Sequence, residues 1–191
     1  MNQNGFTLIE IMVSVSIFVI VALITTGALV TVSDVNRKAQ AIKIAMDNVS
    51  FAMDSMVFNL RDGAEFGCFN GERDFNNAVD ELGEECNGGE NLVFKSKRIN
   101  SGGGDAIIVY RFNPGNSTTP GAIQFASSDN SEYINITSPE VDITDLRFYV
   151  PGTTILGADP KVPRATIIAR GEVAGKSLTE FNLQTSVKAN F

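Results

Sequence analysis

The residue best placed to do chemistry in this chain is a lone carboxylate, Glu10, at the start of a long uncharged run. The run extends from Ile11 to Ser33, and no Lys or Arg precedes Arg37. A carboxylate at the edge of an apolar membrane segment is costly and normally has a cationic partner. If the chain were cut after Gly5, the new α-amine of Phe6 would lie one helical turn before Glu10. That amine, from the same chain or from a neighbouring copy, would supply the cation.

The segment from Gly5 to Glu10 (Gly-Phe-Thr-Leu-Ile-Glu) resembles the processing site of type IV pilins and type II secretion pseudopilins. The resemblance implies that a membrane prepilin peptidase cuts between Gly5 and Phe6 and methylates the new N-terminal Phe6. It also implies that Glu10 pairs with a neighbour's N-terminus during filament assembly. The implied partners are prepilin peptidase, other pilin or pseudopilin subunits, the membrane and an inner-membrane assembly platform.

The uncharged run is long enough to cross a membrane, since about 20 apolar residues of helix span a hydrocarbon core of about 30 Å. A secretory signal is the rival interpretation, but it needs a basic n-region and a shorter apolar run. We therefore predict a leader peptide at residues 1–5 and a transmembrane and filament-core helix at residues 6–33. The expected location is the inner membrane, with the head outside the cytoplasm, followed by an extracytoplasmic filament.

Gly27 lies about two-thirds along this segment, where many pilins have a proline. Glycine weakens a helix by about 1 kcal/mol. Two interpretations stay open: a point where the helix melts locally in a filament, or an ordinary glycine of a membrane helix.

One helix is predicted to continue beyond the membrane segment to Arg61, with Asp62-Gly63 as its stop. Apolar residues recur there at intervals of three and four, which is the period of an amphipathic helix. They are Val35, Ala39, Ile42, Met46, Val49, Met53, Val57 and Leu60. We predict that residues 34–61 pack on a sheet; a coiled coil is the alternative, but the flanking charge pattern that it needs is absent.

Composition excludes several kinds of catalysis. The chain has no His, and it carries a net charge of −7 with a pI near 4.6. Without His, Ser-His-Asp and Cys-His nucleophilic mechanisms are impossible. An acidic chain is also a poor ligand for nucleic acid. An enzyme could still use carboxylates or Lys, but no spacing of these residues in the sequence calls for one. We therefore predict no enzyme activity and no nucleic-acid partner.

Two cysteines, Cys68 and Cys86, stand in an acidic segment at residues 62–91. In an exported domain such a pair is typical of a disulfide, and two free thiols are the alternative. The composition of the segment predicts a long irregular loop with a helical turn near Asn77 to Leu82. Its carboxylates are potential calcium ligands, but a solvated loop is favoured because no Asp-x-Asp-x-Asp-Gly spacing is present. No other cofactor or metal is predicted.

Residues 92–191 have the pattern of an antiparallel β domain. Runs rich in Val, Ile, Phe and Thr alternate with Gly, Pro, Asn and Ser. The predicted strands are Leu92–Lys95, Ala106–Phe112, Ala122–Ala126, Tyr133–Thr137, Val141–Val150, Arg164–Val173 and Thr179–Val187. A long helix followed by an antiparallel meander predicts an α+β fold. This order is similar to the pilin fold, in which the second half of the helix packs on the β-sheet head.

The resemblance implies a structural subunit, a minor pilin or pseudopilin. The segments Val141–Tyr149 and Pro163–Ile168 are loosely similar to the J-type minor pseudopilins. An adhesion or DNA-uptake pilin is one alternative, and a plain single-pass membrane-anchored domain is another. A DNA-binding head would need a basic, aromatic-lined surface, which the acidic composition does not favour.

Three Asn-x-Ser/Thr sequences occur, at Asn48, Asn116 and Asn135. This pattern is the acceptor sequence for N-linked glycans. In a chain rich in Asn and Ser it is expected by chance. Asn116, in a predicted turn, is the one whose position suits a glycan.

Overall fold

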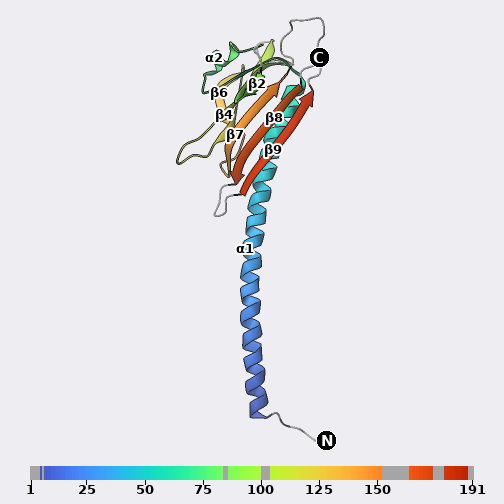
Figure 1. The fold of residues 1–191 in the computed structure, drawn as a ribbon, viewed down its shortest axis with the longest axis vertical. Helices are drawn as coiled ribbons and strands as arrows, with labels where there is room; N and C mark the ends of the chain where they lie inside the picture. The colour runs from blue at the N-terminus through green and yellow to red at the C-terminus, as the bar shows by residue number, and fades with distance from the viewer. Residues whose placement is uncertain are drawn as a thin grey trace. The chain divides into compact units, whose positions relative to one another are not determined.

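The computed structural model describes residues 5, 7–83, 86–99, 104–151, 164–173 and 179–188. The chain forms two units, Met1–Lys43 and Ile44–Phe191. In the described residues the first unit consists of the N-terminal part of helix α1 (Leu8–Arg61). The second unit contains the rest of α1, all of the strands and a short helix, α2 (Phe75–Val79) (Figure 1).

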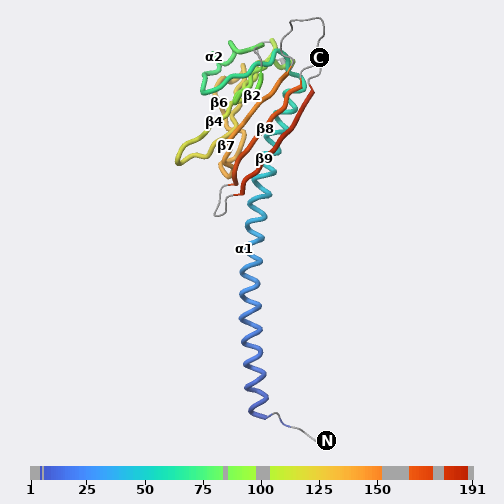
Figure 2. Tube along the Cα trace, in the orientation of Figure 1, coloured from blue at the N-terminus to red at the C-terminus, as the bar shows by residue number. Residues whose placement is uncertain are grey.

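Helix α1 is continuous, as the sequence predicts, and its trace is unbroken in Figure 2. The carbonyl oxygen of Thr7 accepts hydrogen bonds from the amides of Glu10 (3.1 Å) and Ile11 (3.3 Å), which starts the helix. The helix ends at Arg61, and the next element begins at Gly63, where the stop is predicted.

The buried stripe of α1 differs in part from the predicted one. The structure buries Val49, Met53 and Leu60, as predicted. Val35, at the start of the predicted series, is 61% exposed, because it lies in the first unit, where the described residues form helix alone. The buried residues missing from the predicted series are Ala45, Ala52, Met56 and Asn59.

The strands form two antiparallel sheets. One has the order β1-β3-β4-β5-β6 and the other the order β2-β7-β8-β9. The strand bounds are β1 Gly63–Phe69, β2 Cys86–Gly89, β3 Asn91–Ile99, β4 Asp105–Asn113, β5 Ala122–Ser127, β6 Asn130–Asn135, β7 Val141–Val150, β8 Arg164–Val173 and β9 Thr179–Lys188. Strands β3 to β9 overlap the predicted strands, although β3 continues to Ile99 and β6 begins at Asn130, three residues before the predicted start, and ends at Asn135. The α+β prediction is therefore confirmed, with two sheets in the head.

The acidic segment at residues 62–91 is more regular than predicted. It contains β1, α2 and β2, so the prediction of an irregular loop is wrong for these residues. The predicted helical turn is present. Helix α2 begins at Phe75, and turns follow it as far as Leu82, whose amide donates to the Val79 carbonyl (3.2 Å). Strands β1 and β2 exist because they pair with β3 and β7, not because of their own composition.

The main core of the second unit joins α1 to both sheets. Met56 and Leu60 of the helix belong to the same buried cluster as Phe94, Phe148 and Ile167 from the strands. The sheets also meet through main chain, since the Ile143 amide on β7 donates to the Gly121 carbonyl just before β5 (3.0 Å). Phe66 and Cys86 of the acidic segment belong to the same cluster, so this core also holds that segment in place.

Candidate functional site

The predicted cleavage site immediately precedes α1. Gly5 is exposed and lies outside the helix, and a Cβ added to it would meet no atom within 4 Å. Phe6, on the other side of the predicted cut, lies outside the described residues. Gly5 is therefore not packed against any residue that the structure describes.

Glu10 lies in the first turn of α1 and is exposed. The positive end of the helix dipole favours a carboxylate at this position. Within the part of the chain that the structure describes, no Lys or Arg forms an ion pair with Glu10. No side chain among the described residues therefore supplies a cation to Glu10. The predicted source of that cation is the α-amine of Phe6 from the same chain or from a neighbouring copy.

The uncharged part of α1 has its apolar side chains uncovered. The large apolar residues between Leu8 and Val35 are each 47–78% exposed. The helix is long enough and apolar enough to cross a membrane. A continuous apolar surface of this kind marks a region that contacts lipid or other protein.

Five of the six hydroxyl side chains between Ile11 and Ser33 are bonded inside their own helix. Each of five hydroxyl side chains donates a hydrogen bond to the carbonyl oxygen four residues earlier, over distances from 2.7 to 3.1 Å. They belong to Ser14, Ser16, Thr25, Thr26 and Thr31. The tendency of Ser and Thr to bond the i−4 carbonyl in helices is the sequence signal that predicts these bonds.

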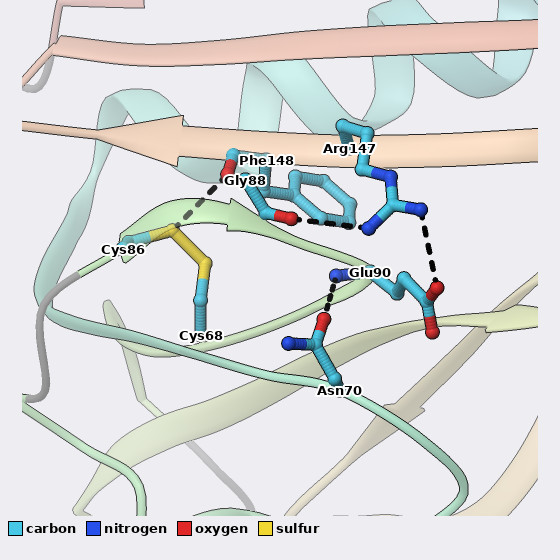
Figure 3. Close-up of a disulfide and its surroundings, with 7 residues drawn as sticks. All are labelled: Cys68, Asn70, Cys86, Gly88, Glu90, Arg147 and Phe148. Carbon is cyan, nitrogen blue, oxygen red and sulfur yellow. Dashed lines mark hydrogen bonds and ion pairs between the residues drawn. A yellow bond between two sulfur atoms is a disulfide. The ribbon is translucent and has the colours of Figure 1, made fainter.

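In the second unit the structure confirms the predicted disulfide between Cys68 and Cys86. Cys68 is on β1 of the five-stranded sheet, and Cys86 is on β2 of the four-stranded sheet. The bond therefore links the two sheets covalently (Figure 3). Cys86 is buried, with its sulfur 3.6 Å from the carbonyl oxygen of Phe148 on β7.

A charged cluster next to the disulfide was missed by the sequence analysis (Figure 3). The Arg147 guanidinium contacts the carboxylates of Asp145 (2.9 Å) and Glu90 (3.3 Å). It also donates to the Gly88 carbonyl (3.3 Å), and the Glu90 amide donates to the side-chain oxygen of Asn70 (3.1 Å). These contacts fasten the end of the acidic segment to β7. No signal in the sequence pairs Arg147 with Gly88 and Glu90, which are distant from it along the chain.

A polar hollow lies over α2 and β4. Its lining residues are Glu72, Arg73, Asp74, Asn77, Asp80 and Arg111. The two guanidinium groups offset the carboxylates, and Arg73 also pairs with Glu81. The described residues contain no group of three or more His, Cys, Asp or Glu side chains arranged to hold a metal ion. The prediction of a solvated acidic segment, with calcium binding as the alternative, stays a prediction.

Beside this hollow, Arg111 covers the ring of Tyr133, with its guanidinium carbon 3.8 Å from the ring centroid. Arg111 is held there by hydrogen bonds from Nε (3.0 Å) and Nη2 (2.6 Å) to the Gln124 side-chain oxygen. The Tyr133 hydroxyl is buried and has no hydrogen-bond partner among the described residues. Burial raises the pKa of Tyr133 above its ordinary value of 10.0; the Arg111 charge opposes this rise and the Asp74 charge adds to it.

Comparison with known protein families gives one result of functional meaning. The model of the prokaryotic N-terminal methylation motif matches residues 1–26. Comparison with curated proteins and with solved structures finds no match. The matched residues include Gly5, Phe6, Glu10 and the first part of the uncharged helix. Together with the long apolar N-terminal helix and the antiparallel sheets, this match shows that the chain carries the N-terminal methylation signature of the type IV pilins and pseudopilins.

Proposed function

We propose that the protein is a structural subunit, a minor pilin or pseudopilin, of a type IV pilus or a type II secretion pseudopilus. The observation that carries this proposal is the methylation motif at residues 1–26, which continues into an uncharged helix with exposed apolar side chains. A surface of this kind is stable in lipid before assembly and against neighbouring helices after it.

Processing prepares the N-terminus for assembly. Prepilin peptidase cuts between Gly5 and Phe6 and methylates the amine of Phe6. The exposed, non-helical Gly5 supports this step, since its main chain is accessible. The cut places a cationic amine one helical turn before Glu10, which has no ion-pair partner among the described residues.

Assembly exchanges lipid for neighbouring subunits around the uncharged helix. The inner-membrane assembly platform extracts the segment from lipid. Packing against other helices offsets the cost of extraction, because each Å² of apolar surface kept from water contributes about 25 cal/mol. Glu10 sets the register, because a polar group left unpaired in apolar surroundings costs several kcal/mol. Only a stagger that brings a neighbour's N-terminal amine to Glu10 avoids this penalty.

The test of processing is the intact mass of the protein from cells with and without prepilin peptidase. We expect a chain that starts at methylated Phe6 only when the peptidase is present. Gly5→Val should block the cut without disturbing the fold, because a Cβ at Gly5 meets no atom within 4 Å. A chain that keeps Met1 in both strains would overturn the proposal and leave a single-pass membrane-anchored domain.

The test of assembly is the amount of protein in sheared filaments. Glu10→Val should be cleaved normally and incorporated poorly, since the amine of the neighbour loses its partner. Ser14→Ala is the matched control, one turn further along, because the Ser14 hydroxyl bonds only the Glu10 carbonyl of its own helix (2.7 Å). Normal incorporation of Glu10→Val would exclude the register role of Glu10.

A further inference from the structure

One of the three Asn-x-Ser/Thr sequences lies on a well-defined exposed loop. Asn116, Ser117 and Thr118 are all exposed in the connection between β4 and β5. Gly115 adopts a φ of 69°, a conformation that suits glycine, and its amide donates to the side-chain oxygen of Asn113 (3.0 Å). The Asn116 amide donates to the Thr119 carbonyl (2.8 Å). The loop thus presents the sequence in one fixed turn.

Within this turn the carboxamide of Asn116 is folded onto Thr118. Its oxygen accepts hydrogen bonds from the Thr118 amide (2.9 Å), the Thr118 hydroxyl (2.8 Å) and the Thr119 amide (3.0 Å). This is an Asx turn, a local structure that Asn forms readily. The side-chain nitrogen makes no hydrogen bond to any residue that the structure describes. The oxygen is therefore engaged by the Thr of the sequence, and the nitrogen is left accessible.

The other two sequences are not presented in this way. Asn48 is inside helix α1, and its side-chain oxygen accepts from the Ser138 amide (3.0 Å). Asn135 is on β6, and its oxygen accepts from the Gln124 side chain (2.8 Å). Thr137, which completes that sequence, is 6% exposed, and its hydroxyl accepts from the Ile123 amide. A transferase must reach both the Asn and the hydroxyl residue, and surface loops allow this whereas packed elements do not.

We propose that Asn116 is the acceptor of an N-linked glycan. The donor is an oligosaccharide joined through its anomeric carbon to a polyprenyl pyrophosphate, and a membrane oligosaccharyltransferase brings the two together. The Asn116 side-chain nitrogen attacks the anomeric carbon, and a carbon–nitrogen bond forms. The bond from that carbon to the pyrophosphate oxygen breaks, the lipid pyrophosphate leaves, and the amide proton passes to a base of the transferase. The step requires the head to be exported, which rests on the proposed function.

Intact-mass and peptide analysis of the protein from its own cells tests this assignment. We expect an added glycan mass on the peptide that contains Asn116. Asn116→Gln and Thr118→Ala should both lose all of the added mass, and Thr118→Ser should retain it because the hydroxyl is kept. Asn48→Gln and Asn135→Gln are the matched controls and should keep the glycan.

Two results would overturn the assignment: a peptide with unmodified Asn116, or an added mass that persists in Asn116→Gln, which would indicate a sugar on Ser117 or Thr118. The same spectrum separates this inference from the proposed function. Removal of residues 1–5 without a glycan contradicts only the Asn116 assignment. A glycan on a chain that keeps Met1 in the presence of prepilin peptidase contradicts only the filament proposal.

Discussion

Asn59 and Tyr110 form a buried hydrogen bond between the helix and the sheet: the Asn59 side-chain nitrogen on α1 donates to the Tyr110 hydroxyl on β4 over 2.7 Å. Tyr110 is fully buried and Asn59 is 9% exposed. The bond lies within an otherwise apolar contact. If the helix slid along the sheet, these buried polar groups would lose their partners, at a cost greater than the bond itself contributes. The pair therefore fixes the position of this part of α1 on the sheet.

Tyr110→Phe should lower the free energy of unfolding by about 1–3 kcal/mol, because the Asn59 amide is left buried without this acceptor. Denaturant unfolding of the full chain in detergent measures the change. Tyr133→Phe is the matched control, since it removes a buried hydroxyl that has no partner among the described residues. Equal losses in the two variants would contradict a specific role for the Asn59–Tyr110 bond.

Tyr133 should reduce stability in alkali. Its pKa is raised in the folded protein, mainly by burial, so the unfolded chain loses the proton first as pH rises through about 10. The stabilising effect is complete below that pH and is lost as pH rises through the raised pKa. The unfolding midpoint of the wild type should therefore fall more steeply with pH than that of Tyr133→Phe once the pH exceeds about 10. Parallel pH profiles would contradict this prediction.

The disulfide should stabilise the head by about 3 kcal/mol on the chain-entropy model. The double variant Cys68→Ala/Cys86→Ala should unfold at a lower denaturant concentration than the oxidised wild type. A reducing agent should shift the wild type towards the double variant and leave the double variant unchanged. If reduction does not change the wild-type midpoint, the link between the sheets has no energetic role.

Gly27→Ala should strengthen α1 by about 1 kcal/mol, since alanine has the higher helix propensity. The new methyl group meets no atom within 4 Å, and α1 is already continuous through Gly27. We expect unchanged cleavage and unchanged incorporation into filaments, measured by mass and by filament shearing. Ala28→Gly, which weakens the helix at the next position, is the reciprocal control. Reduced incorporation of Gly27→Ala with normal cleavage would instead indicate that α1 unwinds there during assembly.

The parts of the fold that the sequence predicts are those whose signal is local. Strands β7 and β8 have the predicted bounds because turn residues flank runs in which buried apolar residues recur about every second position. Strand β2, Cys-Asn-Gly-Gly, has no such signal, and its extended form depends on β7 beside it and on the disulfide. Asn59 was absent from the predicted stripe because a periodicity argument counts apolar residues only.

The same distinction holds for the candidate site. Gly5, Phe6 and Glu10 lie within six consecutive residues, so the sequence alone is enough to recognise the motif that they form. The cluster around Arg147 joins residues from β7 to the segment before β3, and its geometry exists only once β2 has paired with β7. Asn116 combines both kinds of information. The sequence supplies the Asn-x-Ser/Thr pattern, and the structure shows that this one is exposed whereas those at Asn48 and Asn135 lie in packed elements.

The hydroxyl groups of the uncharged helix have a consequence for how this segment changes its surroundings. Each one keeps its hydrogen-bond partner within the helix, so moving the segment from one apolar environment to another breaks none of these bonds. Because their hydroxyl groups are already hydrogen-bonded, those five residues need no polar partner from lipid or from another subunit. Among the polar side chains from Leu8 to Val32, Glu10 is then the one with no hydrogen-bond or ion-pair partner in the part of the chain that the structure describes, so it gains the most from a cation on a neighbouring molecule.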